Sequence, residues 1–417
     1  MGFDSVYLLS VTVQINAMKW NEVIGQDSLK EQLKEMVQHN RLSHALLLLG
    51  GEGVGALPLA LAMAQHMVCE KVAGKQSGAN GGASLFGEEE PVAVDINESC
   101  GNCPACLKAA QLVHPDIHFS YPTVTKKQGE KPIATDFITE WREFVKFNPY
   151  GNLFDWIESI KEKENSQGKI TAEECNDIIR KLSLKSFESE YKILILWMPE
   201  MMGAEGNKLL KLIEEPPLNT LFILVAQNEA QVLPTIISRC QLIKVPSLSA
   251  ANIEAALIER NHSDAATARQ ISLIADGSYR EALQLSQHAE EDWQALLREW
   301  LNATLKYGPV AQVKWVDEMS KLGREKQKQF LLYFNHLLEM SMRLRILGDA
   351  VAIGEKERDF AARLNRIASI EQQEAIVQEL DRAGYHIERN ANAKILFHAL
   401  TIKLYHIIQD KMVFLNN

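Results

Sequence analysis

The sequence lacks the long apolar runs of a membrane protein and the basic excess of a protein that grips nucleic acid over a broad face. No apolar run approaches the ~18–20 residues that span a bilayer. Lys and Arg number 44 against 54 Asp and Glu, which gives a formal net charge of −10. We therefore expect a cytoplasmic protein with no membrane contact, in which any contact with DNA is shared with partners. Its 417 residues are enough for two or three domains.

A glycine-rich stretch near the amino terminus lacks the charged residues that its pattern requires. Four leucines at 46–49 run into a glycine-rich stretch that includes Gly50, Gly53 and Gly55. This order predicts a buried strand, a tight turn and a helix, which is the setting of a P-loop. A working P-loop places Lys and then Ser or Thr after the last glycine, to hold phosphates and Mg²⁺. Ala56 and Leu57 stand there instead, so we expect a loop that keeps its shape and does not bind ATP.

A second requirement of P-loop ATPases is also missing. Residues 192–198 form a continuous apolar run, typical of a buried strand in a parallel sheet. Active ATPases carry an acidic residue at the end of this strand for the Mg²⁺ shell, and AAA+ members add a glutamate that polarises water. Trp197 and Met198 occupy that place. Glu200 is the nearest carboxylate, and we do not expect it to compensate.

Four of the six cysteines are grouped, at Cys69, Cys100, Cys103 and Cys106. In a reducing compartment such grouping indicates a metal site rather than disulfides. Zinc takes four ligands in a tetrahedron, and we expect Cys69 as the fourth ligand, with His114 as the alternative. Free thiols in a turn are the competing interpretation. Four cysteine ligands would leave no open position, so the zinc would be structural. Cys175 and Cys240 are scattered, and we interpret them as small buried side chains.

The sequence divides into four parts, which are residues 1–17, 18–246, 247–292 and 293–417. The first part lacks the basic start of a secretory signal, and we interpret it as a non-native or disordered extension before a true start at Met18. The second alternates strand and helix patterns and contains apparent insertions near 70–99 and 123–167. We find no chemistry in the insertion at 123–167. The third predicts a small three-helix unit and the fourth a helical bundle.

Several short motifs together resemble the delta-prime subunits of bacterial sliding-clamp loaders, which are AAA+ relatives within the DNA polymerase III holoenzyme. Beside the four cysteines, these motifs are Ile24-Gly25-Gln26, Ser43-His44-Ala45-Leu46, His114-Pro115-Asp116, Leu209-Leu210-Lys211, Glu214-Glu215-Pro216-Pro217, Leu233-Pro234-Thr235, Ser238-Arg239-Cys240 and Asn390-Ala391-Asn392-Ala393-Lys394. The resemblance implies an α/β P-loop (AAA+) domain with a parallel sheet, followed by a small helical lid and an all-α C-terminal collar that joins a ring of subunits.

The resemblance also implies a role for two arginines. Arg239 would reach into the ATP site of a neighbouring subunit as a trans arginine finger, a device typically worth ~10³–10⁵ in rate. Without the motif, a solvated arginine at a helix end would be the simpler interpretation. Arg280 resembles the AAA+ sensor-2 position, where we expect a structural ion pair. The implied partners are gamma/tau-type and delta subunits, the sliding clamp, and primer–template DNA through the assembled complex.

Two other functions fit parts of the sequence. An ATP-hydrolysing gamma/tau-type subunit would need a lysine in the loop, and Ala56 argues against it. A zinc-dependent DNA-binding module would need a basic surface, which the acidic balance disfavours. No nucleophile, base or open metal site is recognisable. We therefore expect no activity from this chain alone, only from the DNA-directed DNA polymerase (nucleotidyltransferase) holoenzyme of which it would be a subunit.

Overall fold

The computed structural model describes residues 18–39, 41–74, 97–125, 131–161, 167–287, 293–348, 355–388 and 391–410. The expected extension at 1–17 lies outside these residues, as do 75–96 of the first expected insertion and 126–130 and 162–166 of the second. The chain forms two compact units. One comprises Met1–Ser272 with Asp276–Leu283, and the other comprises Leu273–Ala275 with Gln284–Asn417. Among the described residues, no helix is long and apolar enough to cross a membrane.

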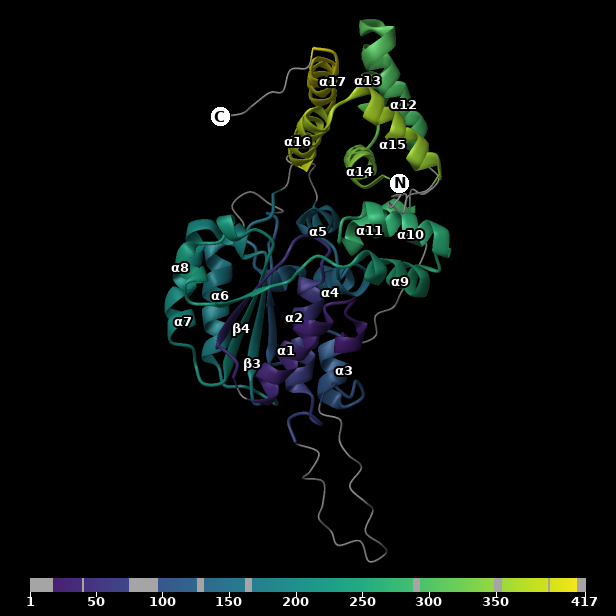
Figure 1. The fold of residues 1–417 in the computed structure, drawn as a ribbon. Helices are drawn as coiled ribbons and strands as arrows, with labels where there is room; N and C mark the ends of the chain where they lie inside the picture. Colours follow the sequence, from purple (N-terminus) through teal and green to yellow (C-terminus); the bar gives the residue numbers. More distant parts are fainter. Residues whose placement is uncertain are drawn as a thin grey trace, which may run out of the picture. The chain divides into compact units, whose positions relative to one another are not determined.

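The first unit is built on a five-stranded parallel sheet (Figure 1). Its strands are β1 (Ala45–Leu49), β2 (Ile117–Ser120), β3 (Lys192–Trp197), β4 (Thr220–Ala226) and β5 (Gln241–Lys244), in the order β2-β3-β4-β1-β5. Every residue of β3 and β4 is buried, as the apolar runs of parallel strands require. The glycine loop follows β1, which is an inner strand of the sheet. This arrangement confirms the predicted α/β class with a parallel sheet.

Helices cover both faces of this sheet, so the first unit has two cores (Figure 1). The core on one face is closed by α1 (Asp27–Gln38), α2 (Ala56–Val68), α3 (Pro104–Ala110), α4 (Ile138–Phe147) and α5 (Leu153–Ile160). The core on the other face is closed by α6 (Ala172–Ser183), η4 (Pro199–Leu209), α7 (Leu210–Glu214) and α8 (Pro234–Ile237). Successive strand residues enter opposite cores, as Ile193 and Leu194 do, because strand side chains alternate.

The segment that reads as a second insertion is packed into the first of these cores. Two of its stretches form helices, α4 and α5. The Trp141 ring is fully buried, stacks on Tyr121 at 4.1 Å, and lies 5.3 Å from the rings of both Trp156 and Trp197. The indole N–H of Trp156 donates to the Pro122 carbonyl at 2.6 Å. This aromatic cluster ties the segment to the end of β3.

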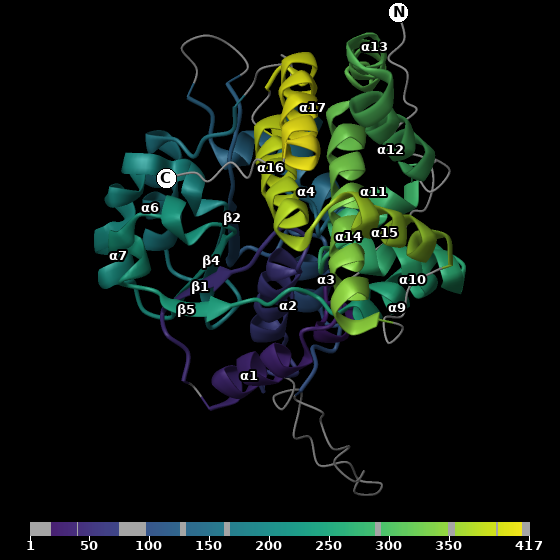
Figure 2. The ribbon, with the colours of Figure 1, turned by 45° about the horizontal axis from the view of Figure 1, so that its top comes forward.

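Three further helices follow the sheet, namely α9 (Ala250–Asn261), α10 (Ala265–Ile274) and α11 (Tyr279–Gln287). The second unit is helical, with α12 (Trp293–Asn302), η6 (Ala303–Tyr307), α13 (Pro309–Met319), α14 (Arg324–Leu347), α15 (Glu355–Ile367), α16 (Ile370–Glu388) and α17 (Ala393–Gln409). One face of α14 is buried, including Phe330, Phe334 and Leu337. Helices α16 and α17 pack side by side (Figure 2). The helix-rich C-terminal region is therefore confirmed.

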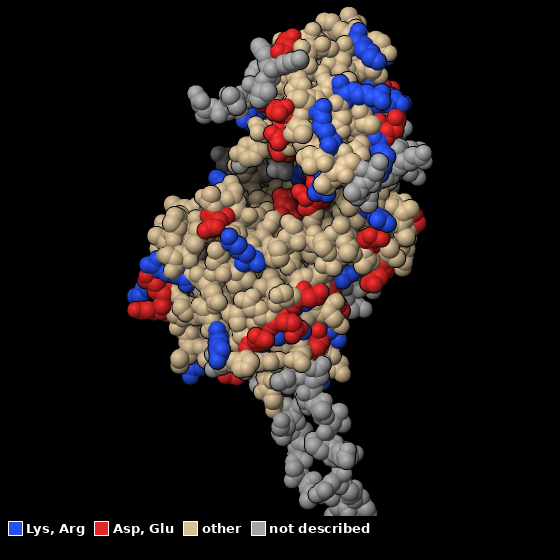
Figure 3. Space-filling model, in the orientation of Figure 1, with Lys and Arg blue, Asp and Glu red and all other residues tan. Residues whose placement is uncertain are grey.

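Charged side chains are mixed over the first unit. On the face drawn in Figure 3, Lys and Arg are scattered among Asp and Glu, and the described residues of this unit form no continuous basic surface there. A protein that holds DNA by itself presents such a surface, because phosphate contacts supply most of the non-specific affinity. The view agrees with the acidic balance of the whole sequence.

We predict that Trp141→Ala destabilises the first unit by about 3–5 kcal/mol, because it removes a fully buried ring and leaves a cavity. Urea unfolding followed by near-ultraviolet circular dichroism measures the loss. Phe147, the last residue of the same helix, is 39% exposed. Phe147→Ala is therefore the matched control and should lower the free energy of unfolding much less. Equal losses for the two variants would contradict the central place of the aromatic cluster.

Candidate functional site

The glycine loop after β1 has a backbone that its glycines make possible. Gly53 and Gly55 have φ of 70° and 95°, in the left-handed region that other residues disfavour. A side chain at Gly53 would lie 2.2 Å from the Ser278 hydroxyl, because α11 begins directly against the loop. The Gly53 carbonyl accepts a hydrogen bond from the Tyr279 N–H at 3.1 Å. The loop therefore keeps a tight turn in front of α2, as the sequence predicts.

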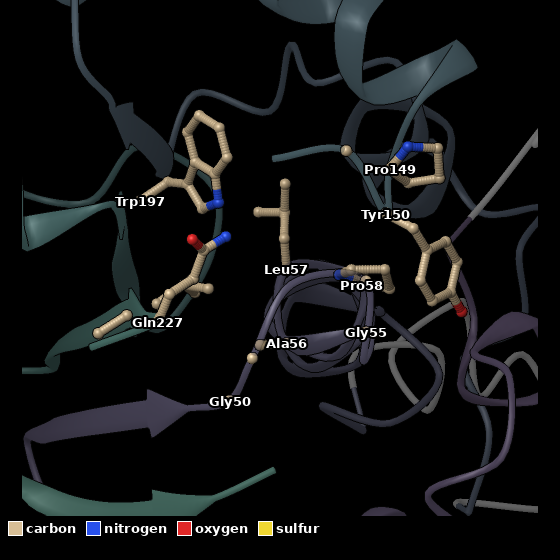
Figure 4. Close-up of a pocket in the computed structure, with 14 residues that line it drawn as sticks. Gly50, Gly55, Ala56, Leu57, Pro58, Pro149, Tyr150, Trp197 and Gln227 are labelled. Carbon is tan, nitrogen blue, oxygen red and sulfur yellow. The ribbon is translucent and has the colours of Figure 1, made fainter. Parts of the chain in front are cut away.

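Apolar side chains occupy the space in front of this loop (Figure 4). Leu57 and Trp197 are 4% and 2% exposed, and they line the pocket together with Tyr150 and Gln227. Figure 4 shows Leu57, Trp197 and Gln227 directed toward one another. The cavity that remains is about 20 Å³, roughly the space of one water molecule. Leu57 and Trp197 stand where polar ligands are expected, and their side chains also occupy the space in front of the loop.

Arg280 makes the ion pair that the sequence leads us to expect. Its side chain is 4% exposed, and its guanidinium binds the Asp155 carboxylate in a bidentate manner, at 2.5 and 2.7 Å. Glu281 accepts a further bond at 2.9 Å, and Glu52 of the glycine loop lies 3.9 Å away. The Asn152 amide donates to Glu52 at 2.8 Å. Carboxylates from the loop and from α5 thus surround the guanidinium.

The Glu200 side chain is hydrogen-bonded to backbone N–H groups. Its carboxylate accepts hydrogen bonds from the N–H groups of Gln227 and Asn228, at 2.6 and 2.9 Å, just after β4. The side chain is buried, and burial raises the pKa of Glu200 above its usual value. These contacts give it a structural part, in line with the expectation that it does not replace a missing Mg²⁺ ligand.

The four grouped cysteines converge, and their Sγ atoms all lie within 4.8 Å of one another. Cys69 follows α2, and Cys103 caps α3 by accepting the Cys106 N–H at 3.4 Å. The N–H groups of Cys100 and Cys103 donate to the sulfurs of Cys69 and Cys100, each at 3.4 Å. The sulfurs of Cys100 and Cys106 are 3.9 Å apart, close to the ~3.8 Å edge of a tetrahedral Zn–S site. The cluster could hold a metal ion.

The close sulfurs of the cluster shift one another's pKa values. The hydrogen bond between the Cys106 thiol and the Cys69 sulfur lowers the pKa of Cys69 to about 4 and raises the pKa of Cys106, because the two sulfurs share one proton. His114, the alternative ligand, lies elsewhere, with its ring 3.3 Å from the Glu188 carboxylate. Burial raises the pKa of Cys175 and of Cys240 to about 11, as for unreactive thiols. The structure thus groups Cys69 with the other three cysteines.

Arg239 lies at the end of α8, immediately before β5. Its guanidinium donates to the Glu214 carboxylate at 2.6 Å and to the Thr235 carbonyl at 2.7 Å. The side chain is 31% exposed. An open hollow beside it is lined by residues of the same segment, among them Val232, Pro234, Ile237 and Ser238. The guanidinium is therefore oriented and accessible from solvent.

Comparison with known proteins identifies the family. A model of the family described as DNA polymerase III, delta subunit, matches residues 25–249, which is more than half of the chain. The chain belongs to this family. The match confirms the resemblance that the motifs carry, and it covers the sheet, the cysteines and Arg239.

Some of the similar proteins are named as delta' subunits and others as gamma subunits. The DNA polymerase III subunit delta' of Bacillus subtilis is 26% identical over 281 residues, which cover 66% of this chain and 63% of that protein. The delta' subunit of Escherichia coli is 23% identical over 95% of this chain and 98% of its own length. The gamma subunit of Buchnera aphidicola subsp. Acyrthosiphon pisum is 24% identical over 94% and 85%. A solved gamma-related protein of Thermotoga maritima, 14% identical, covers 90% and 98% with a TM-score of 0.32.

Sequence reasoning missed part of this site. Tyr150 and Asp155 come from the segment in which the sequence shows no chemistry, yet one lines the pocket and the other pairs with Arg280. One local signal is readable, because Asn152 and Asp155 have the spacing of a capping box at the start of α5. That signal predicts the start of a helix but not the ion pair of Asp155 with Arg280.

We predict that Asp155→Ala destabilises the first unit by about 3 kcal/mol, because it leaves a buried guanidinium with less opposite charge. Arg280→Met in the same chain should recover part of the loss, since the unpaired charge is then gone. A double-mutant cycle from urea unfolding measures the coupling, expected at about 1–3 kcal/mol. Asp359→Ala, which breaks an exposed pair with Arg363, should have little effect. Additive losses for Asp155 and Arg280 would refute the pairing.

Proposed function

We propose that this chain is a clamp-loader subunit that does not hydrolyse ATP and that completes the ATP site of a neighbouring subunit through Arg239. The observation that carries the proposal is the filled glycine loop, in which Leu57 and Trp197 occupy the space in front of the turn. Asp155 and Glu52 already supply negative charge to Arg280. Ala56 stands in place of the P-loop lysine and about 20 Å³ remains in the pocket, which supports the proposal that this subunit binds no triphosphate and acts as a fixed platform.

The proposed setting is the ring of the DNA polymerase III clamp loader in the bacterial cytoplasm. Relatives named delta', gamma and tau support it. In this proposal, residues 18–246 form the AAA+ domain, 247–292 the lid and 293–417 the collar that joins the ring. The partners are gamma/tau-type and delta subunits, the sliding clamp, and primer–template DNA held by the whole assembly.

Arg239 suits a role in trans for two reasons. It precedes β5, an edge strand of the sheet, so a neighbouring subunit can approach it. Its pair with Glu214 is partly exposed, with side chains 31% and 46% exposed, and such pairs contribute only about 0–1 kcal/mol. Exchanging the Glu214 carboxylate for a neighbour's phosphate therefore costs little, while the Thr235 carbonyl keeps the guanidinium oriented.

An ATP-hydrolysing subunit of the gamma/tau type is the second candidate, because a gamma relative matches at an identity similar to that of the delta' relatives. It requires ATP to bind in front of Ala56. Equilibrium binding of a fluorescent ATP analogue to the isolated full chain separates the two candidates, since binding at micromolar concentration would favour the gamma/tau type.

We predict that Arg239→Ala lowers the clamp- and DNA-stimulated ATPase rate of the reconstituted loader. At the site that faces this chain, the loss should approach the ~10³-fold typical of an arginine finger. Gel filtration verifies that the loader still assembles. Arg180→Ala is the matched control, since it removes a 74% exposed arginine that pairs with Asp177 on α6. An unchanged rate for Arg239→Ala would contradict the arginine-finger role and would leave this chain a structural part of the loader.

The four cysteines are proposed to hold a structural zinc ion. We expect about one zinc per chain in protein purified under reducing conditions, measured by mass spectrometry of the metal. Cys106→Ser should lose the zinc and melt at a lower temperature, because binding energy at such a site is folding energy. Cys240→Ser should keep the metal, because Cys240 lies outside the cluster. A chain that folds without metal and binds none would exclude the site.

A further inference from the structure

One short segment lines the pocket in front of the glycine loop and also contacts three separate parts of the first unit around it. It comprises residues 149–155, which lead from α4 into α5. Pro149, Tyr150 and Gly151 line the pocket (Figure 4). A turn fixes the start of the segment, since the Gly151 N–H donates to the Asn148 carbonyl at 2.9 Å. The side chains that follow are therefore presented to the loop from a fixed backbone.

Tyr150 makes the first of these contacts. Its hydroxyl accepts a hydrogen bond from the backbone N–H of Ile24 at 2.8 Å, shortly before α1. Tyr150 is 4% exposed, and its ring lies so close to the loop that a side chain at Gly55 would come within 3.1 Å of it. The ring also meets the ring of Tyr279 edge-on, with centroids 5.1 Å apart. Burial raises the pKa of Tyr150 to about 12, so the hydroxyl stays neutral.

Asn152 and Asp155 make the other contacts, and each holds the other in place. The Asn152 side chain accepts the Asp155 N–H at 3.0 Å, and the Asp155 carboxylate accepts the Asn152 N–H at 3.1 Å, at the start of α5. From this position the Asn152 amide donates to Glu52 of the glycine loop, and the carboxylate binds Arg280 of α11. The two side chains that start the helix therefore also hold the loop and α11.

Together these contacts resemble those of a bound ligand. A ligand that touches several elements couples them while it is bound, and the coupling ends when it leaves. Residues 149–155 touch the segment before α1, the glycine loop and α11, all within the first unit. They belong to the chain, however, and a tethered group acts at an effective concentration on the order of millimolar. A free ligand must compete with that concentration, and the tethered group does not leave.

We propose that residues 149–155 form an internal strap that takes the place of a ligand and keeps α11 fixed to the glycine loop. This inference rests on the proposed function, in which the chain binds no triphosphate and acts as a fixed platform. It adds the residues that make the platform rigid. The Asp155 carboxylate occupies the position of an anionic group beside Arg280, and the Tyr150 hydroxyl supplies a neutral acceptor to Ile24.

The first test measures whether the contacts of the strap act together. Hydrogen exchange with mass spectrometry reports the protection of peptides that contain Ile24, Gly53 or Tyr279. Tyr150→Phe keeps the ring and removes the hydroxyl that accepts the Ile24 N–H. We expect exchange in the full chain to rise about tenfold in all three peptides, because the strap links them. Tyr307→Phe, which alters a 70% exposed tyrosine, is the matched control and should change none of them.

The second test asks whether a free anion can replace the strap. Asp155→Ala with Glu52→Gln removes two carboxylates that face the Arg280 guanidinium. Millimolar inorganic phosphate should then bind the guanidinium, raise the melting temperature of this variant by about 3–5 °C and slow exchange at Tyr279. Potassium chloride at the same ionic strength is the control. Phosphate should shift the wild-type chain by about 1 °C or less, because Asp155 already occupies the position.

The outcomes separate the strap from the function on which it rests. A rise in exchange confined to the Ile24 peptide, or a double variant that phosphate does not stabilise more than it stabilises the wild type, would overturn the strap and leave the proposal for Arg239 intact. Binding of the fluorescent ATP analogue by the wild-type chain would overturn both. Protection lost together in Tyr150→Phe and restored by phosphate in the double variant, with Tyr307→Phe unchanged, would establish the strap.

Discussion

The buried guanidinium of Arg280 imposes the constraint on which the rest of the site depends. A charge that is 4% exposed must have a partner, because leaving it unpaired costs several kcal/mol. In a protein that binds a nucleotide at this place, phosphate can supply the opposite charge. Here Asp155 of α5 and Glu52 of the glycine loop supply it. The loop, α5 and α11 are therefore held together by the chain's own carboxylates, with no requirement for a ligand.

Internal pairing of this kind changes what the first unit can do. A ligand shifts a conformational equilibrium only through a difference in its affinity for the two states. With Leu57 and Trp197 lining the pocket and Asp155 on the guanidinium, the chain's own side chains make the contacts around the loop. In the proposed function, these contacts would keep Arg239 at a constant place without a bound nucleotide.

The parts of the fold that sequence predicts are those with a local signature. Parallel strands are continuous apolar runs, helices repeat their apolar face, and the spacing of three cysteines brings their sulfurs together. Cys69 lies beside the other three cysteines because α2 ends next to them, whereas its part as a zinc ligand stays a prediction. The pair of Asp155 with Arg280 spans 125 residues and has no such signature. The exposure of Phe187 could not be predicted from the sequence either, because the loop that carries it is hydrogen-bonded to Asp116, which is distant in the sequence.

The arrangement of the strands relates the pocket to Arg239. In open parallel sheets, ligands bind beyond the carboxyl ends of the strands, and here Leu57 and Trp197 lie at that position, after β1. Arg239 instead precedes β5, at the amino end of its strand. All five strands are parallel, so the pocket and Arg239 belong to opposite ends of the sheet. The contact that we propose for Arg239 would therefore not depend on the residues that line the pocket, because it needs only a rigid side chain at a surface.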